Sequence, residues 1–488
     1  MEEVRVRFAP SPTGYLHIGG ARTALFNWLF AKKHNGKLVL RIEDTDTERL
    51  KEDSVSQILT SLKWLALNWD EGPEVGGEVG PYYQSERREI YSKVAEQLLE
   101  EGKAYYCFCT SEILEAEREK QRAAKQPFRY ARTCRDLPVE EAKARAAKGE
   151  PYSVRIKIPT EGNLTVHDLI HGDVTFDLTQ FDDFVIVKTN GMPTYNFAVV
   201  VDDHLMRISH VLRAEEHLSN TPKQVLLYEA CGFAVPKFGH MPMILAPDRS
   251  KLSKRHGATS VEEFREQGYL PEAIVNYLTL LGWAPGNEEE IFSLQDTVAQ
   301  FELEKMSKKA AVYDTKKLTW MNGQYLSALP LEAVLPEAKI FFIKSGLVDE
   351  AWLEANKDYF SRLVDVVRVR VKTLQEVVEA AEYFFKEVES YDEKGVGKHF
   401  KPEAAELLTV CINALEALET FDLASTEAAY NKIAEEQGLS LGKVVHPTRL
   451  ALTGRTVSPG LFDVMVLLGK ETTLSRMRKA VQYIKALA

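Results

Sequence analysis

Apolar and polar residues alternate in two different periods at the start of the chain. Residues 4–8 place valine and phenylalanine on one side and arginine on the other, a period of two that predicts a half-buried strand. Residues 9–14 break this pattern with proline and glycine. Residues 15–34 carry apolar side chains at helical spacing, and residues 37–42 form a second apolar run. The order strand, helix, strand predicts a parallel βαβ unit.

The pattern changes twice further along the chain. From residue 104, a cysteine-bearing segment leads into a charged helix at 113–125 and short β-like runs at 152–158, 164–167, 174–178 and 184–188. A β/α alternation then resumes, with expected strands at 195–201, 207–212 and 241–245 and a helix at 217–230. Beyond residue 257 the apolar residues recur mainly at helical spacing.

These patterns predict a Rossmann-like α/β fold, a doubly wound parallel sheet, with an α+β insertion and a helical C-terminal half. The two halves of the α/β domain are expected at 1–103 and 192–256, and the insertion at 104–191. A first helical region is expected at 257–328 and an all-α region at 329–488. A length of 488 residues is compatible with several domains of this kind.

Composition narrows the class of protein. Hydrophobic residues make up 45% and charged residues 27% of the chain, the balance of an ordinary globular protein. No apolar run is long enough to span a bilayer, and the first residues lack the features of a signal peptide. We therefore expect a cytoplasmic protein without membrane contacts. The net charge of −11 argues against a general nucleic-acid coat protein but not against one basic RNA-binding face.

The first candidate for chemistry is the turn between the first strand and helix. It contains Ser11, Thr13 and Gly14 and opens the helix with His17, followed by Gly19 and Gly20. A helix N-terminus offers free N–H groups and partial positive charge to a phosphate, and the glycines allow close approach. The segment matches neither of the common glycine-rich phosphate loops. By itself it is equally compatible with a tight turn capped by threonine.

A second candidate lies far downstream. Lys251, Ser253 and Lys254 fall in one basic loop, where two ammonium groups could follow a triphosphate and stabilise the leaving pyrophosphate. Alone, such a loop is more often a solvated surface segment.

Together the two segments resemble the signature motifs of class I aminoacyl-tRNA synthetases, which usually read His-Ile-Gly-His and Lys-Met-Ser-Lys-Ser. Gly20 replaces the second histidine, which is a feature of the glutamyl branch. Leu252 and Arg255 are mild departures within the second motif, and Ala214 is a mild departure within residues 210–217. Segments 41–46, 193–197, 201–204, 210–217 and 443–460 are also similar to that branch. The resemblance therefore covers nearly the whole chain.

This resemblance implies ATP- and Mg²⁺-dependent activation of L-glutamate and its transfer to the terminal adenosine of a tRNA. It assigns catalytic roles to His17, Lys251 and Lys254, and ATP binding to Pro10, Thr13, Gly14, His17, Gly19, Gly20, Lys251, Ser253 and Lys254. It assigns glutamate binding to Arg7, Ala9, Ser11, Glu43, Tyr195 and Arg213. The chemistry agrees, because guanidinium groups suit the two carboxylates and an acidic residue suits the ammonium.

The resemblance also implies a tRNA partner, with the insertion at the acceptor end, residues 257–328 at the stem and the C-terminal helices at the anticodon. Arg368 and Arg370 lie in the basic run 367–372, and they join Asp44 and Arg449 as candidate tRNA contacts. A solvated helix face explains the run equally well. Transfer RNA-Glu is the expected substrate, and tRNA-Gln is left open as a second one. A monomer is expected by resemblance.

Three cysteines of the insertion suggest a metal. Cys107, Cys109 and Cys134 could bind structural zinc with Asp136 as the fourth ligand, or with Tyr130 in its place. Three unligated thiols, left from a lost site, are an equal alternative. Cys231 and Cys411 lie in apolar surroundings and are expected in the core.

Three rival functions remain. A tRNA-modifying relative that glutamylates a queuosine base lacks the anticodon-binding half. A nucleotidyltransferase lacks the 41–46 segment and the helical half. A non-catalytic RNA-binding paralogue would not require His17, Lys251 and Lys254.

Overall fold

The structure is a computed structural model that describes residues 3–45, 53–126, 128–286 and 288–487, without the side chain of Lys254. The chain forms two compact units. One comprises Met1–Phe264 and Ile274–Asp314, and the other comprises Arg265–Ala273 and Thr315–Ala488. None of the described helices is both apolar and long enough to cross a membrane.

The predicted βαβ unit opens the first compact unit. Strand β1 (Arg5–Phe8) pairs in parallel with β2 (Lys37–Leu40), and α1 (Ile18–Lys33) connects them. Helix α1 begins three residues later than predicted because His17 serves as its N-cap. Gly36 lets the chain turn back into β2, since a Cβ atom there would lie 2.2 Å from the carbonyl oxygen of Val4.

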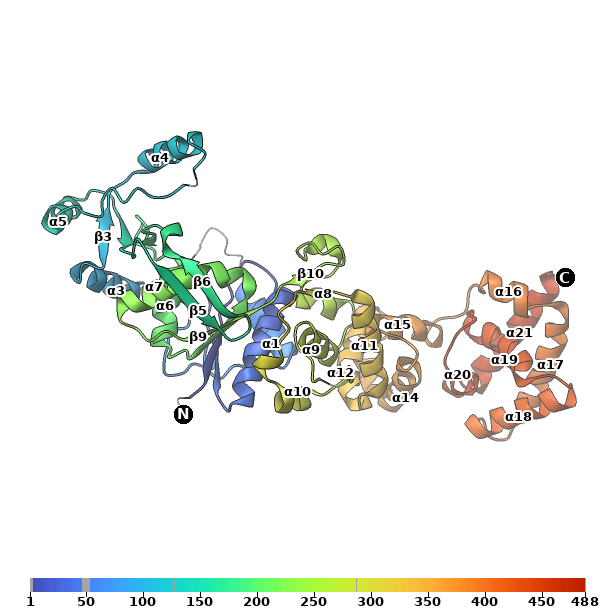
Figure 1. Cartoon of the computed structure of the whole chain (residues 1–488). Coiled ribbons are helices and arrows are strands. Elements are labelled where there is room, and N and C mark those ends of the chain that lie inside the picture. Colours follow the sequence, from blue (N-terminus) through green and yellow to red (C-terminus); the bar gives the residue numbers. More distant parts are fainter. Residues whose placement is uncertain (1–2, 46–52, 127, 287, 488) are drawn as a thin grey trace. The chain divides into compact units, whose positions relative to one another are not determined.

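A four-stranded sheet forms the centre of this unit, in the order β6 (Gly172–Asp177), β5 (Asn163–Asp168), β9 (Lys237–Met241), β8 (His210–Ala214). Strand β9 is parallel to both neighbours, whereas β5 and β6 form an antiparallel hairpin (Figure 1). Strand β1 lies beside β8, because the Ser209 amide donates to the Arg5 carbonyl at 2.9 Å. The predicted Rossmann-like domain is therefore present, with mixed rather than purely parallel pairing.

One predicted strand of this domain is a helix, and the strand predicted at 241–245 is divided between the end of β9 and β10 (Ile244–Leu245). Residues 195–201 were expected to form a strand, but they begin helix α6 (Tyr195–Leu205). A short apolar run is compatible with a buried strand or a buried helix, and the pattern alone does not distinguish them. Here Phe197, Val200 and Val201 pack into the core with α7 (Thr221–Cys231) and α3 (Arg88–Glu100).

The insertion contains the predicted short strands and the predicted charged helix, and it also contains a second helix that was not predicted. Strands β3 (Ala104–Cys107), β4 (Ser153–Ile156) and β7 (Val185–Val187) pair in that order, with α4 (Ser111–Ala123) and α5 (Val139–Ala147) between β3 and β4. The β5–β6 hairpin also comes from the insertion, but it joins the central sheet through β9. The insertion is therefore built into the edge of the central sheet.

Short elements complete the first unit. They are α2 (Ser54–Trp64), η1 (Gln84–Arg87), η2 (Leu178–Gln180), η3 (Glu215–Asn220), η4 (Lys254–His256), α8 (Val261–Glu266), α9 (Pro271–Leu280), α10 (Leu294–Gln300), η5 (Leu303–Lys305) and the parallel pair β10 (Ile244–Leu245) and β11 (Ala311–Val312). Helices α8 and α9 each have some residues in the first unit and some in the second.

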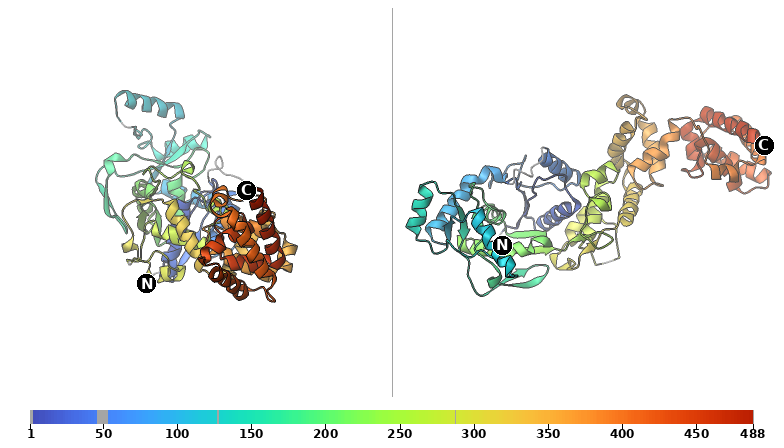
Figure 2. Two further views of the ribbon diagram at one scale, coloured as in Figure 1. Left: turned by 90° about the vertical axis from the view of Figure 1, so that its right-hand side faces the viewer. Right: turned by 90° about the horizontal axis from the view of Figure 1, so that it is seen from above.

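The second unit is helical throughout its described residues, as predicted for 329–488. It contains α11 (Thr315–Ala328), α12 (Leu331–Lys344), α13 (Glu350–Ala355), α14 (Lys357–Arg368), α15 (Leu374–Ala381), η6 (Glu382–Phe384), α16 (Glu393–His399), α17 (Pro402–Glu416), α18 (Leu423–Glu436), α19 (Leu441–Thr453), α20 (Leu461–Leu468) and α21 (Lys470–Leu487). Helices α16–α21 gather into one bundle (Figure 2), whose core includes Leu408, Cys411 and Met477. Cys231 and Cys411 are both buried, as expected.

Candidate active site

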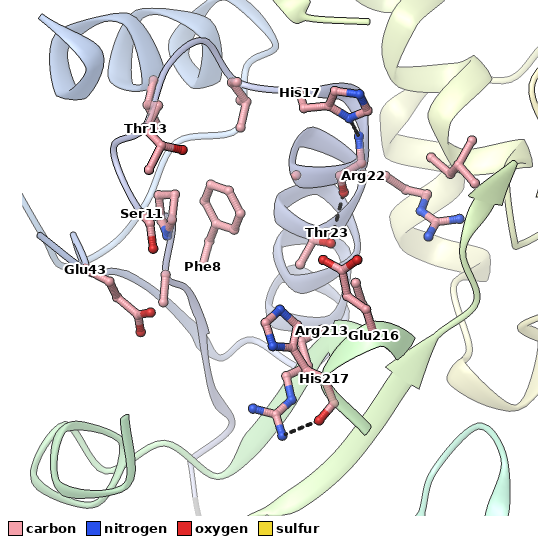
Figure 3. Close-up of a pocket in the computed structure, with 18 of the residues that line it drawn as sticks. Phe8, Ser11, Thr13, His17, Arg22, Thr23, Glu43, Arg213, Glu216 and His217 are labelled. Carbon is pink, nitrogen blue, oxygen red and sulfur yellow. Dashed lines mark hydrogen bonds between the residues drawn. The ribbon is translucent and has the colours of Figure 1, made fainter. Parts of the chain in front are cut away.

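A cavity of about 690 Å³ opens beside the end of β1 and the start of α1 (Figure 3). Ligands of open α/β folds bind at this carboxyl edge of the strands. Every residue predicted to bind ATP or glutamate lines it, apart from Lys254, whose side chain lies outside the described part of the chain. These residues are Arg7, Ala9, Pro10, Ser11, Thr13, Gly14, His17, Gly19, Gly20, Glu43, Tyr195, Arg213, Lys251 and Ser253.

His17 lies at the helical end of the cavity. Its Nδ1 accepts a hydrogen bond from the Gly19 amide at 3.1 Å, so the neutral ring carries its proton on Nε2. The exposed Nε2–H can therefore donate to an oxygen of a bound ligand. Burial lowers the pKa of His17, and Lys251 acts in the same direction against Glu263. The ring is thus held as a neutral donor at neutral pH.

The basic loop reaches the same cavity although it lies far away in the sequence. Leu245 and Lys251 form a backbone bridge, and the Lys251 ammonium contacts the Glu216 carboxylate at 2.9 Å. The Ile18 amide donates to the Thr259 carbonyl at 2.9 Å, which holds the start of α1 against the segment after the loop. Two segments that are each ambiguous in sequence therefore form one site.

A buried network of ion pairs surrounds the other end of the cavity. Arg7 Nε donates to both oxygens of Asp203, at 3.2 and 3.3 Å, and Arg41 Nη1 contacts the same carboxylate at 2.7 Å. Arg41 Nη2 also contacts Glu43 at 3.1 Å. Burial raises the pKa of Glu43, while Arg41 and Arg7 oppose that shift. Each of these two arginines thus already has a carboxylate partner.

Arg213 differs from Arg7 in this respect. Its side chain is 4% exposed, and its Nη1 has no hydrogen-bond partner within the described structure. Burial lowers the pKa of its guanidinium. Tyr195 lies nearby with its hydroxyl 3.3 Å from His217 Nδ1. Arg213 therefore presents a buried cation that is suited to a ligand carboxylate.

Sequence reasoning missed several members of this network. Asp202 accepts from Arg87 at 2.6 Å, and Asp203 neutralises Arg7, yet neither carboxylate was among the candidates. The available signal was two consecutive acidic residues inside the apolar run 197–206. Of the 41–46 segment, Arg41 and Glu43 belong to the network, whereas Asp46 lies outside the described residues. Asp44 accepts from the Ser85 amide at 2.7 Å and does not line the cavity.

A cluster of three thiols lies in the insertion. The Sγ atoms of Cys107, Cys109 and Cys134 are all within 4.8 Å of one another, and those of Cys109 and Cys134 are 3.8 Å apart. Two thiolates bound tetrahedrally to zinc at about 2.3 Å lie about 3.8 Å apart, so the spacing suits that metal. The hydroxyl of Tyr130 lies 3.3 Å from Cys107 Sγ and 3.7 Å from Cys109 Sγ.

Asp136 does not belong to this cluster. Its side chain is exposed, and it is absent from the group of metal-ligating atoms found among the described residues. The prediction of Asp136 as fourth ligand is therefore wrong, because the turn after Cys134 directs the carboxylate outward. The hydroxyl of Tyr130, rather than that carboxylate, lies beside the thiols.

The candidate tRNA contacts of the second unit divide into two kinds. Arg368 is 8% exposed and donates to the carbonyl oxygens of Leu326 and Leu329, both at 2.7 Å. Helix α14 therefore turns Arg368 inward, away from the exposed position that a tRNA contact requires. Arg370 is exposed, and its charge contributes with burial to lowering the pKa of Arg449. Arg370 and the half-buried Arg449 thus remain the candidate tRNA contacts of this unit.

Comparisons with known proteins agree with this geometry. The family of class I tRNA synthetases (E and Q), catalytic domain, matches residues 3–320, and the anticodon binding domain family matches residues 332–481. The second match covers the half that the queuosine-modifying rival lacks.

Individual relatives extend over the full length. A glutamate–tRNA ligase of Moorella thermoacetica is 55% identical over 99% of both chains. Glutamate–tRNA ligase 2 of Caldicellulosiruptor saccharolyticus is 54% identical over 98% of this chain and 99% of its own. The crystal structure of a glutamate tRNA ligase from Elizabethkingia meningosepticum, in complex with its amino acid, is 38% identical with a TM-score of 0.90, and the match covers 99% of this chain and 100% of that one. The chain therefore belongs to the glutamate–tRNA ligase family of class I aminoacyl-tRNA synthetases.

Proposed function

We propose that this cavity activates L-glutamate with ATP and passes the glutamyl group to the terminal adenosine of tRNA-Glu. The observation that carries the proposal is the meeting of His17 and Lys251 in one cavity with Arg213, whose Nη1 has no partner within the described structure. The first two residues suit phosphate, and the third suits a carboxylate.

The amino acid is recognised by charge. Arg213 receives one carboxylate of glutamate, and Arg7, oriented by Asp203, contributes to the same end of the cavity. Glu43 lines the cavity and receives the ammonium group, which offsets the cost of its burial. Tyr195 donates a further hydrogen bond, and Ala9 and Ser11 form the wall of the cavity.

Adenylate formation requires position and charge stabilisation but no covalent enzyme intermediate. His17 donates from Nε2 to an α-phosphate oxygen while the glutamate carboxylate attacks in line. Lys251 and Lys254 stabilise the departing pyrophosphate. Mg²⁺, when bound with ATP, neutralises phosphate charge. Pro10, Thr13, Gly14, Gly19, Gly20 and Ser253 form the surface along the nucleotide.

Recognition of tRNA rests on the second unit and on the insertion. Arg370 and Arg449 contact the anticodon arm, and Asp44, which accepts a hydrogen bond from the Ser85 amide, is a further tRNA contact. Whether tRNA-Gln is also charged depends on how one anticodon base is received there. A monomer in the cytoplasm remains the prediction from sequence.

The insertion binds one structural zinc ion through Cys107, Cys109 and Cys134, with Tyr130 as fourth ligand. Hydrogen bonds from Tyr130 and Arg155 hold the pKa of Cys107 below its usual value although burial acts in the opposite direction. Metal analysis of the purified chain should give one zinc equivalent. Tyr130→Phe should lower this content, whereas Asp136→Asn should leave it unchanged, and the reverse order would contradict the assignment.

Aminoacylation with labelled glutamate tests the central proposal, using tRNA-Glu and tRNA-Gln separately. Lys254→Ala should abolish charging, and Lys93→Ala, an exposed lysine of α3, is the matched control. Charging of tRNA-Glu alone indicates a discriminating enzyme, and charging of both tRNAs indicates a non-discriminating one. Charging of neither tRNA by the unaltered chain would refute the proposal.

A further inference from the structure

A chain of three buried polar side chains connects the insertion to the glutamate end of the cavity. Asp168 ends β5, His240 lies on β9 and Arg213 lies on β8, and their exposed fractions are 4%, 0% and 4%. His240 Nδ1 lies 2.6 Å from Asp168 Oδ2, and Arg213 Nε lies 3.1 Å from His240 Nε2. We call this chain the relay.

The direction of each hydrogen bond in the relay follows from chemistry. A guanidinium group only donates, so Arg213 Nε–H donates and His240 Nε2 accepts. The proton of the neutral imidazole is therefore on Nδ1, from which it donates to Asp168. Burial lowers the pKa of His240, although Asp168 acts in the opposite direction. The ring is thus a neutral spacer between a carboxylate and a cation.

Asp168 is itself held in place by the backbone. The amides of Ile170 and His171 donate to its Oδ1 at 2.9 and 2.8 Å, and the amide of His240 donates to its Oδ2 at 3.1 Å. Burial acts to raise the pKa of Asp168, but the hydrogen bonds from His240, His171 and Ile170 keep it below the usual value. The carboxylate is therefore a fixed, ionised acceptor at the base of the relay.

The relay determines which part of Arg213 remains available. Nε is bound to His240, and Nη2 donates to Thr221 Oγ1 at 2.9 Å. Nη1 alone lacks a partner within the described structure, and Arg213 lines the cavity. Phe238, two residues before His240 on β9, lies with its ring centroid 5.5 Å from the guanidinium. Nε and Nη2 are thus held by protein partners, and Nη1 is the guanidinium nitrogen that is left for a ligand.

We infer that Asp168 and His240 are positioning residues for the binding of the substrate's side-chain carboxylate. They hold the plane of Arg213 so that Nη1 is presented to the ligand before binding, which removes an orientational cost from each binding event. The insertion thereby contributes, through Asp168, to amino-acid selectivity. This inference rests on the proposed function of the cavity.

Two amide variants of His240 distinguish a role in orienting Arg213 from a role in filling space in the core. His240→Asn retains an N–H group toward Asp168 but places no acceptor beside Arg213. His240→Gln reaches the position of Nε2 and retains that acceptor. We expect His240→Asn to raise the KM for glutamate about 10- to 100-fold with the KM for ATP unchanged, the usual effect of losing such a supporting residue. His240→Gln should restore the KM to within about threefold of the unaltered chain.

Asp168→Asn is an independent second variant. Its amide group would donate to Nδ1, move the imidazole proton to Nε2 and set two donors against each other at Arg213. It should also raise the KM for glutamate selectively. Equal KM values for His240→Asn and His240→Gln, or a parallel rise in the KM for ATP, would overturn the inference.

A direct measurement of the tautomer does not depend on activity. Nitrogen-15 NMR of histidine-labelled chain, assigned with His240→Gln, should show His240 protonated on Nδ1. Protonation on Nε2 would refute the relay even if the chain charges glutamate. Conversely, an inactive chain with the Nδ1–H tautomer would refute the proposed function and leave the relay standing.

Discussion

Replacing Arg213 with glutamine removes one charge from the cavity while keeping a side chain that can donate a hydrogen bond. Arg213 is buried, and its Nη1 has no partner within the described structure. The charge of Arg7 is already balanced by Asp203, since its Nε donates to both oxygens of that carboxylate. The substrate carboxylate would then be desolvated without a full counter-charge.

The expected loss follows from the burial of the site. Removing one member of a buried, hydrogen-bonded charge pair costs about 2–5 kcal/mol. At about 1.4 kcal/mol for each factor of ten, kcat/KM for glutamate should fall about 30-fold to about 5,000-fold. The KM for ATP should remain unchanged, because the nucleotide end of the cavity is formed by other residues, which include His17 and Lys251.

Steady-state aminoacylation of tRNA-Glu at varied glutamate concentration measures this loss. Arg88→Gln is the matched control, since Arg88 is an exposed arginine at the start of α3, and it should behave like the unaltered chain. Thermal unfolding of both variants checks that the fold is retained. A decrease of less than about threefold in kcat/KM for Arg213→Gln, about 0.7 kcal/mol, would refute the assignment of the carboxylate to Arg213.

Three further predictions concern tRNA binding and stability. Arg449→Ala should raise the KM for tRNA about tenfold and leave the KM for glutamate unchanged, and an unchanged KM for tRNA would contradict its role. Burial lowers the pKa of His210 to about 4 from 6.5, so the folded state binds fewer protons than the unfolded state between these values. Urea unfolding should therefore show stability that is constant above pH 6.5 and falls toward pH 4, and His210→Gln should flatten this slope. Leu408→Ala, at a fully buried position of α17, should destabilise the second unit by about 2–5 kcal/mol in urea unfolding monitored by circular dichroism, and a loss below about 1 kcal/mol would show that α17 is not packed as described.

Local pattern was sufficient for much of the fold. The βαβ unit, the insertion strands and the helical second half were all predicted, because each depends on periodicity within one segment. Helix α6 was predicted as a strand, because a short, continuously apolar run shows neither the period of a helix nor the period of a strand. The pairing of β5 with β9 was not predicted either, because strand pairing depends on residues far apart in the sequence.

The sequence by itself determined which residue types meet in the cavity, since the two motifs carry their own chemistry. It did not determine which of these side chains are buried or already paired with another charge. Arg7 and Arg213 are equivalent as residue types, but Arg7 is paired with the carboxylate of Asp203, 196 residues away. Arg213 is instead held by the uncharged His240 and Thr221, and its buried Nη1 has no partner within the described structure. Arg368 is similarly turned inward beside an exposed Arg370. Burial and ion pairing arise only when distant segments meet, so only the tertiary structure decided which charges remain available to a ligand.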